Sequence, residues 1–498
     1  MINHSRIALT LFIVCVYLLS FSQETPQTEI RGSLVDAQSQ EPLLYANIYV
    51  LRTGKGIISN EKGRYSINVS DLEMTDTIRF QYMGYEAKNI ALSQLLQSPL
   101  VQLEEDIINL SETMIFGNSV NLKEVIKTVA EKLSSNYSSM NIQREVFIRE
   151  RYTSEIKHLD FKYKKSSIPE VDQNTIAKIK EKVPRLSLSY TDFYGKMLMS
   201  STPVDTLPFK LQPLRVISLD EEDLMELEKT AHVFEKAFKD TDSTEYWKVK
   251  TGIIGGKVAI EKKDSTENDL QDDEKLLRYF SSSLKYSLAN AEFNEDEWEF
   301  LYNTSRYEYT LFGGSRIGDE EIYIIDFKAK NKGKYEGRLF VSMQSHAILR
   351  ADYQYAPDKT GRDFSLLGIS YTEAQYTASV HFEKIDSTYQ LKYLSYKKLD
   401  RFSFDRKLAL IKKRIRTLFD KTLFELKTAV DISAQSEESF EFLVLSHESI
   451  LPQTYDKFDQ QKEMEVLYVD QFSDDLWKGY NIIEPTHKMR EYKKHIYD

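Results

Sequence analysis

Cysteine is almost absent from this chain, and the position of the one that occurs is informative. Cys15 lies within the apolar run Ile7–Phe21, which follows the basic residue Arg6. A short apolar run behind a positive charge is typical of a secretory signal peptide, which we place at residues 1–22, with cleavage before Gln23. An uncleaved N-terminal anchor is the alternative. The mature chain then has no disulfide, no thiol nucleophile and no cysteine metal ligand.

The sequence also lacks paired cysteines, an excess of positive charge and further long apolar runs. Many extracellular eukaryotic proteins carry disulfides, so a large exported chain without them favours a bacterial cell envelope, in the periplasm or at the outer membrane. The net charge of −11 argues against a general nucleic-acid binder. Only 18 glycines and 11 prolines occur in 498 residues, which excludes long linkers, whereas 31 tyrosines favour β structure.

Alternation of apolar and polar side chains dominates residues 27–103. The runs 44–50, 65–69 and 78–82 each place apolar residues on one face of a strand. Turn residues separate these runs, and Gly63 is suited to a positive φ in a tight turn. Roughly six or seven short strands separated by turns predict a β-sandwich.

Four motifs follow one another in this part of the chain: EPLLYANIYV at 41–50, SNEKGRYSI at 59–67, FQYMGYE at 80–86 and the tail LSETMIFG at 110–117. In this order they resemble the carboxypeptidase-regulatory-like domain (CarboxypepD_reg-like, transthyretin-like) of Bacteroidetes proteins. The resemblance implies a seven-stranded β-sandwich without catalytic residues of its own. It also implies a docking module for envelope or outer-membrane partners.

The remainder of the chain mixes helix and strand patterns. Helices are predicted over residues 121–137, 218–238 and 273–288, and strands over 144–150 and 298–355. Ser218 is expected to cap the second helix, with Glu221 three residues on. We therefore predict a mainly β chain: the sandwich, followed by an α+β domain with a large antiparallel sheet and a few helices. The expected segments are the signal peptide 1–22, the sandwich 23–105, a linker 106–120 and the second domain 121–498.

Two stretches of the second domain resemble other bacterial chains. Residues 335–350 resemble a hairpin of uncharacterised Bacteroidetes proteins that share the N-terminal module, and Trp477–Ile483 resembles the ending of the same group. The hairpin is also similar to the open β-barrel of periplasmic lipoprotein carriers. That likeness implies, as an alternative function, a lipid or lipoprotein carrier with an apolar cavity.

No motif assembles a convincing catalytic centre. Of eight histidines, only His232 has a glutamate three residues on, Glu235, and the next residue is a lysine where an inverted zinc motif needs histidine. We interpret the pair as solvated on a helix. The glycine-rich runs 252–258 and 312–318 lack the spacing of a phosphate loop or a nucleophile elbow, so Ser315 receives no catalytic role. We predict a chain that is not an enzyme and has no cofactor or metal site.

Charge is clustered in both signs. The acidic runs 220–223 and 272–274 lack the alternation of a calcium loop, and the first suits the start of a helix. A basic run reverses the charge of the chain locally. It is either a solvated face or a contact for anionic lipid or lipopolysaccharide phosphates. The pattern fits a helix or a strand. The residues proposed for that contact are Arg406, Lys412, Lys413, Arg414 and Arg416.

Three functions are compatible with these patterns. The first is a non-catalytic envelope protein that binds or scaffolds, with the N-terminal sandwich as its docking module and peripheral membrane contact. The second is a periplasmic lipid or lipoprotein carrier, which requires an apolar cavity. The third is a hydrolase of cell-surface polymers, which requires converging carboxylates or histidines in a cleft.

Overall fold

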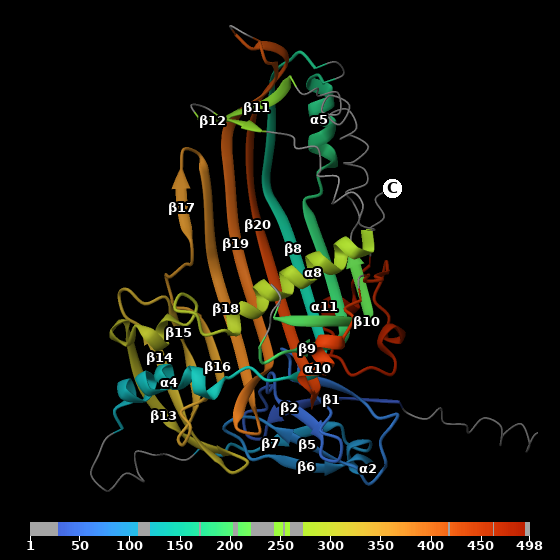
Figure 1. Ribbon diagram of the computed structural model, residues 1–498, viewed down its shortest axis with the longest axis vertical. Helices are drawn as coiled ribbons and strands as arrows, with labels where there is room; N and C mark the ends of the chain where they lie inside the picture. Colours follow the sequence, from blue (N-terminus) through green and yellow to red (C-terminus); the bar gives the residue numbers. More distant parts are fainter. Residues whose placement is uncertain are drawn as a thin grey trace, which may run out of the picture. The chain divides into compact units, whose positions relative to one another are not determined.

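The chain divides into two compact units (Figure 1). The structure, a computed structural model, describes residues 28–107, 120–168, 171–202, 208–220, 244–251, 254–258, 272–416, 419–461 and 463–493. The N-terminal unit extends to Tyr82 and includes Ala87–Glu104 and Asp474–Glu484, and the C-terminal unit contains the rest. The predicted signal peptide and the motif at 110–117 lie outside the described residues.

Seven strands of the N-terminal unit form two small sheets, which confirms the predicted sandwich strands. They are β1 (Glu29–Asp36), β2 (Asn47–Val50), β3 (Gly56–Ile58), β4 (Arg64–Asn68), β5 (Thr77–Gln81), β6 (Lys88–Ala91) and β7 (Leu100–Leu103). The strand orders are β4-β1-β7 and β3-β2-β5-β6, and β1 and β7 run parallel. The short helix α2 (Leu92–Leu95) follows β6.

The core of this unit joins the two sheets through their apolar faces. Tyr65 of β4 and Phe80 of β5 are fully buried, and their rings meet edge to face with centroids 5.4 Å apart. Gly63 adopts a φ of +66°, as its place in the turn predicts. A Cβ atom at Gly63 would lie 2.6 Å from the carbonyl oxygen of Leu34, so the turn admits only glycine at this position.

A segment from the other end of the sequence completes the N-terminal unit. Within Asp474–Glu484, the side chain of Trp477 is buried, and Asn481 Oδ1 accepts a hydrogen bond of 2.9 Å from the backbone N–H of Asn68. Asn60 Nδ2 donates to the carbonyl oxygen of Glu484 at 3.0 Å. We expected residues 121–498 to form one domain. Eleven of these residues, Asp474–Glu484, belong instead to the first compact unit.

One large, mostly antiparallel sheet forms the body of the C-terminal unit. The main strand order is β13-β14-β15-β16-β18-β19-β20-β8-β9-β10-β21, with β17 on β18, β11 on β19 and β12 on β11. The strands are β8 (Ile142–Ser166), β9 (Leu186–Met199), β10 (Phe209–Asp220), β11 (Glu245–Thr251), β12 (Ile254–Val258), β13 (Tyr307–Ile317), β14 (Glu320–Ala329), β15 (Tyr335–Ser342), β16 (Ile348–Tyr355), β17 (Asp363–Leu366), β18 (Ile369–Ile385), β19 (Thr388–Arg414), β20 (Lys421–Ser449) and β21 (Leu467–Tyr468).

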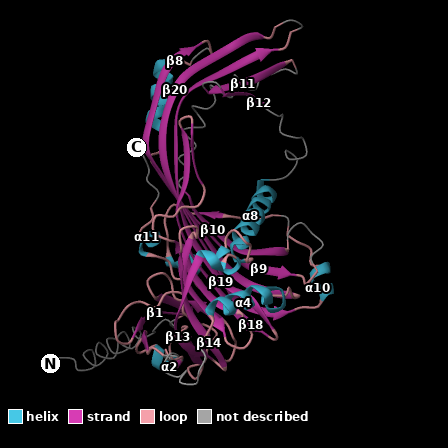
Figure 2. Ribbon diagram, turned by 90° about the vertical axis from the view of Figure 1, so that its left-hand side faces the viewer, coloured by secondary structure: helices cyan, strands magenta, loops and turns pink. Residues whose placement is uncertain are grey.

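Three neighbouring strands are much longer than the others. β8, β19 and β20 contain 25, 27 and 29 residues, which corresponds to about 80–100 Å of extended chain. β9 pairs with β8 only as far as Glu155, and beyond that point the long strands continue towards β11, β12 and helix α5 (Gln173–Lys182) (Figures 1 and 2). There Ile176 of α5, Trp247 of β11 and Leu426 of β20 form a small separate core.

Helices pack on the sheet and complete the main core. They include α4 (Leu122–Asn136), α8 (Asp272–Leu288) and α9 (Glu299–Tyr302), whereas α10 (Pro452–Lys457) and α11 (His487–Arg490) lie near the C-terminus. Leu277, Phe280 and Leu284 of α8 repeat at helical spacing and are buried. They join a cluster that includes Trp298 and Phe300, both fully buried.

The predicted helices at 121–137 and 273–288 are confirmed, whereas the predicted helix start at Ser218 is wrong. Ser218 lies in β10, where it is paired with Thr191 of β9 and Tyr468 of β21. Because these pairings engage the strand up to Asp220, Ser218 cannot act as a helix cap. Residues 221–243, which contain Glu221, His232 and Glu235, lie outside the described residues. The predicted strand region 298–355 begins instead with the short helix α9.

The glycine-rich stretches occupy strands and contain no phosphate-binding loop where they are described. Gly313 and Ser315 lie in β13, which has a register shift between Leu311 and Gly313. Ser315 is buried opposite Ile322. Within the described part of the chain, no helix combines the length and the apolar character needed to cross a membrane.

Replacing Trp477 with alanine tests whether the C-terminal segment supports the N-terminal unit. We expect Trp477→Ala to lower the free energy of unfolding of this unit by about 3 kcal/mol, because a large buried ring is lost. Asn481→Ala should cost about 1 kcal/mol, because the N–H of Asn68 loses its acceptor. Urea denaturation would measure both changes. Lys478→Ala, an exposed change in the same segment, is the matched control, and equal effects of all three variants would contradict this account.

Candidate functional site

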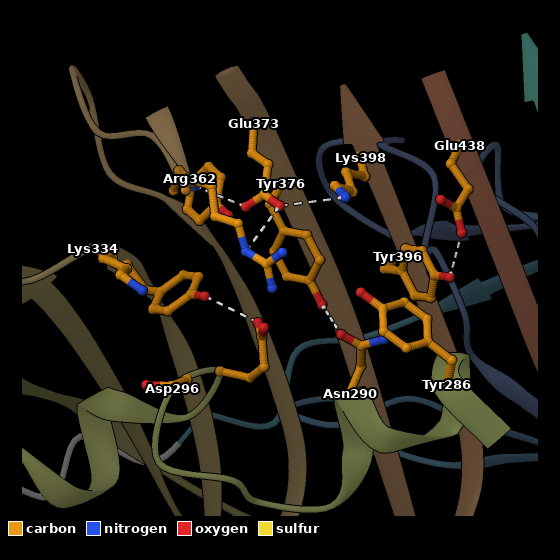
Figure 3. Close-up of a pocket in the computed structure, with 14 residues that line it drawn as sticks. Tyr286, Asn290, Asp296, Lys334, Arg362, Glu373, Tyr376, Tyr396, Lys398 and Glu438 are labelled. Carbon is orange, nitrogen blue, oxygen red and sulfur yellow. Dashed lines mark hydrogen bonds and ion pairs between the residues drawn. The ribbon is translucent and has the colours of Figure 1, made fainter. Parts of the chain in front are cut away.

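A polar pocket of about 240 Å³ lies in the C-terminal unit, between the sheet and the C-terminal end of α8 (Figure 3). Tyrosines, carboxylates and cations dominate its lining. The lining residues are Tyr286, Asn290, Asp296, Glu297, Lys334, Tyr335, Tyr355, Gly361, Arg362, Glu373, Tyr376, Tyr396, Lys398 and Glu438. Strands β15, β16, β18, β19 and β20 each contribute at least one of these residues, so the pocket depends on the order of the sheet.

One aromatic ring from each of these five adjacent strands forms a continuous row, which we call the tyrosine row. It consists of Tyr335, Tyr355, Tyr376, Tyr396 and Phe440. Successive ring centroids are 5.4, 5.7, 6.2 and 5.3 Å apart. Direct cross-strand pairing aligns the first two members and the last two, and such pairs stabilise a sheet. The row therefore provides a rigid base for the pocket.

Hydrogen bonds hold the hydroxyl groups of the row at the pocket. Tyr335 donates to Glu297 Oε2 at 3.2 Å, and Tyr376 donates to Asn290 Oδ1 at 3.3 Å. Tyr396 donates to a carboxylate oxygen of Glu438 at 2.6 Å. Burial raises the pKa of Tyr335, Tyr376 and Tyr396, so these hydroxyls stay protonated at neutral pH and remain donors.

Glu373 of β18 organises the charged side of the pocket. Its Oε1 lies 3.5 Å from Nζ of Lys398, and its Oε2 accepts a 2.9 Å hydrogen bond from the backbone N–H of Arg362. Gly361 permits this contact, because a Cβ atom there would lie 2.1 Å from Glu373 Oε2 and 2.3 Å from the hydroxyl of Tyr355. The loop thus approaches the carboxylate more closely than a side chain would allow.

Positive and negative charges are nearly balanced in the pocket. Burial lowers the pKa of Lys398, but the charges of Asp400 and Glu373 outweigh this effect and raise the pKa overall, so the amine stays charged. Four carboxylates and three cations line the pocket. Such a lining does not favour a ligand of high net charge, and it offers donors and acceptors on several sides.

Glu150 of β8 provides a titrating carboxyl group beside Glu438. Burial and the neighbouring charge of Glu438 raise the pKa of Glu150 to about 7, although a hydrogen bond with Ser283 of α8 opposes this shift. Glu150 is paired with Phe440 in the sheet, two residue pairs from Glu438, so both carboxyl groups lie on the same face. A carboxyl group with a raised pKa next to a second carboxyl group is a feature of acid–base sites, and this pair is the strongest local argument for hydrolase chemistry.

A serine, a histidine and an aspartate also meet, but not in the order of a catalytic triad. Ser379 Oγ lies 2.9 Å from His381 Nε2 and donates to Asp352 Oδ1 at 2.6 Å. The serine therefore stands between the other two, whereas a triad needs the histidine there. Ser379 and His381 are buried, and burial together with the charge of Arg350 lowers the pKa of His381. Among the described residues, no group of three His, Cys, Asp or Glu side chains is placed to hold a metal ion.

The predicted basic contact lies on a strand rather than a helix. Arg406, Lys412, Lys413 and Arg414 belong to β19, and Arg416 follows it. The contact predicted for Lys412 is wrong, because its side chain is 3% exposed and its Nζ lies 3.1 Å from Glu245 Oε2.

The other predicted basic residues differ in their partners. Arg406 donates to the carbonyl oxygens of Leu367 and Thr251, and Arg414 pairs with Glu245 at 2.6 Å. Lys413 and Arg416 make no ion pair with a described residue.

None of the pocket residues was singled out from the sequence. The high tyrosine content favours β structure, and Tyr335, Tyr355 and Tyr376 each continue a β alternation. The signal for the row is the recurrence of an aromatic residue, mostly tyrosine, in adjacent strands of the sheet. Its use would have required the strand order, in which β15, β16 and β18 are neighbours.

Residues 30–115 match the family model of the CarboxypepD_reg-like domain. The N-terminal part of this chain is therefore a CarboxypepD_reg-like domain, as its four motifs predicted. The match covers the sandwich and the segment after it but not the second unit. None of the curated proteins compared with the chain matches it.

Solved structures show only distant likeness to this chain. A chain from the Pseudomonas aeruginosa complex of MucA and MucB is 10% identical, with 63% of this chain and 93% of that chain covered and a TM-score of 0.16. A LolA-superfamily protein from Nitrosomonas europaea is also 10% identical, with coverages of 68% and 98% and a TM-score of 0.16. A putative membrane-associated protein of unknown function from Bacteroides fragilis is 8% identical, with coverages of 84% and 98% and a TM-score of 0.12. TM-scores this low do not establish a common fold.

Replacing Glu150 with glutamine should change how stability depends on pH. The folded state keeps the proton of Glu150 up to about pH 7, whereas an unfolded glutamate loses it near pH 4.5. The contribution of Glu150 to stability therefore falls as the pH rises from 4.5 to 7. Glu150→Gln should match the wild type at pH 4.5 and exceed it at pH 8 by a free energy of unfolding of about 3 kcal/mol. Chemical denaturation at both pH values measures this, and a pH-independent difference would refute the assignment.

Proposed function

We propose that this chain is a non-catalytic binding protein of the bacterial cell envelope whose polar pocket binds a small, neutral ligand rich in hydroxyl groups, such as the terminal unit of a saccharide. The observation that carries the proposal is the tyrosine row, which holds several protonated hydroxyls beside carboxylates and amines in one pocket. The envelope location is supported by the signal-like residues 1–22 and by the CarboxypepD_reg-like domain.

The chemistry of a saccharide matches the pocket in two ways. A sugar ring has an apolar C–H face and a rim of hydroxyl groups that donate and accept hydrogen bonds. Tyr286 offers an exposed ring at the mouth, and Glu373 and Lys398 offer an acceptor and a donor deeper in. The volume of about 240 Å³ is small for a ligand site, which favours one ring over a long chain.

The same pocket gives little support to the hydrolase function. Glu150 and Glu438 are adjacent carboxyl groups, but Glu438 is engaged by the hydroxyl of Tyr396 and Glu150 is not among the residues that line the pocket. A glycosidase needs both carboxyl groups exposed to the bond that it cleaves. We therefore propose that Glu150 and Glu438 have a structural role, in which they support the tyrosine row.

A lipid carrier is the second candidate, and one surface favours it. Phe364 of β17, Tyr371 of β18 and Phe402 of β19 are paired across the strands, and Leu366, Ile369 and Phe404 form the adjacent row. Phe364, Leu366 and Phe402 are exposed. An acyl chain could cover these side chains. Organic extraction of the purified protein distinguishes a lipid carrier from a saccharide-binding protein, because lipid recovered in a fixed molar ratio to the protein supports the carrier.

Replacing Tyr286 with alanine is the most direct test of the binding site, because helix α8 provides a matched control. Tyr286 and Tyr279 lie on this helix and are both 70% exposed, but only Tyr286 lines the pocket. We expect Tyr286→Ala to weaken saccharide binding about 5- to 10-fold, because the ring face is lost, and Tyr279→Ala to leave it unchanged.

The measurement is saturation-transfer NMR followed by calorimetry with a panel of neutral oligosaccharides. Glu373→Gln serves as a second variant that keeps the shape of the pocket and should also weaken binding. Failure of the whole panel to bind the wild type, or equal binding by Tyr286→Ala and Tyr279→Ala, would refute the saccharide proposal.

A further inference from the structure

The distal end of the long strands concentrates positive charge in an acidic chain. This basic end consists of the described residues 157–168, 171–185, 244–251, 406–416 and 419–427, which come from β8, α5, β11, β19 and β20. It contains eighteen lysines and arginines but only six aspartates and glutamates, whereas the whole chain has a net charge of −11. The register brings these segments together, because Lys412 pairs with Phe424 of β20 and with Trp247 of β11, and Lys427 pairs with Lys165 of β8.

Several of the carboxylates within the basic end are already shared between two cations. Glu425 lies 3.3 Å from Lys165 and 2.8 Å from Lys427. Glu245 lies between Lys412 and Arg414 at 3.1 and 2.6 Å.

Asp160 repeats this arrangement with Lys162 at 3.7 Å and Lys180 at 2.9 Å. Each of these three sites therefore keeps one excess positive charge. The ion pairs within the basic end do not neutralise it.

Exposed apolar side chains lie among the cations at the tip of the β19–β20 hairpin. Ile415 is 54% exposed and Phe419 is 86% exposed. Lys413, Arg416 and Lys421 lie close to them in sequence and make no ion pair with a described residue. Water solvates a large exposed phenylalanine poorly, so this combination of a ring and surrounding cations points to a partner with an apolar interior and an anionic surface.

We propose that the basic end docks on the anionic surface of a lipid bilayer, with Phe419 and Ile415 entering the interface and Lys413, Arg416 and Lys421 contacting lipid phosphates. Each basic residue near an anionic bilayer contributes to binding, and long cationic side chains reach phosphates while adjacent apolar groups enter the acyl boundary. An acidic protein or a nucleic acid would satisfy the cations but would leave Phe419 without an apolar environment.

The proposal does not depend on the saccharide pocket. The pocket residues lie on α8, the loops beside it and the strands β15, β16 and β18–β20 near Tyr396, whereas the basic end begins at Arg406 on β19. Loss of membrane binding can therefore be measured in variants whose pocket is unchanged. Conversely, failure of the saccharide test would leave the docking surface untouched.

Vesicle co-sedimentation of the purified full chain tests the docking surface. Vesicles of phosphatidylcholine with 30 to 40% phosphatidylglycerol, a composition chosen for about one anionic lipid in three, are compared with phosphatidylcholine alone. We expect binding only to the anionic vesicles, with a decrease as the salt concentration rises. The combined variant Lys413→Glu, Arg416→Glu, Lys421→Glu should lose about 100-fold or more in affinity.

The control reverses three exposed lysines elsewhere: Lys123→Glu, Lys127→Glu and Lys332→Glu. This variant has the same change in net charge and should bind within about threefold of the wild type. Circular dichroism melts of all variants establish that they are folded. Phe419→Ser is a second test that keeps every charge, and it should weaken vesicle binding about 10-fold without changing retention on a heparin column.

Three results would overturn the proposal. The first is equal binding to neutral and anionic vesicles. The second is an equal loss in the control and in the Lys413, Arg416 and Lys421 variant. The third is an unchanged vesicle affinity of Phe419→Ser, which would instead identify the surface as a site for a soluble polyanion.

Discussion

Continuous antiparallel pairing between β8, β20 and β19 is the constraint on which the C-terminal unit depends. Each strand contains at least 25 residues, and the pairing keeps its alternation except at a few register shifts. Because side chains alternate along a strand, the register with β19, which is continuous from Phe424 to Leu443, places Glu438, Ile432 and Leu426 of β20 on the same face. A slip of one residue would turn all of them to the opposite face. The register of β20 therefore determines both the pocket and the distal core.

The pocket shows how a sheet can build a binding surface from residues that are far apart in the sequence. Tyr335 and Phe440 are more than a hundred residues apart, yet they begin and end one aromatic row. Buried polar groups require partners, and here Glu297, Asn290 and Glu438 accept from the row. The same contacts that satisfy these hydroxyls also fix the positions from which a ligand would be recognised.

Local patterns predicted much of the fold but little of the site. The sandwich strands, Gly63 and the helices α4 and α8 followed from alternation, turn chemistry and helical spacing. Ser218 was assigned wrongly, because a polar residue before acidic ones resembles a helix cap, whereas strand pairing with β9 and β21 determined its conformation. Lys412 was assigned to the surface because sequence does not reveal a partner as distant as Glu245. The pocket requires the strand order, which no local pattern encodes.

Asp474–Glu484 belongs to the N-terminal unit, so the packing of that unit depends on a segment that is synthesised several hundred residues later. The sandwich strands leave the ribosome several hundred residues before Trp477 and Asn481, which complete their packing, have been synthesised. Until then the unit lacks a buried ring and an acceptor for the N–H of Asn68. A premature stop codon before Asp474 should therefore lower the stability of the N-terminal unit.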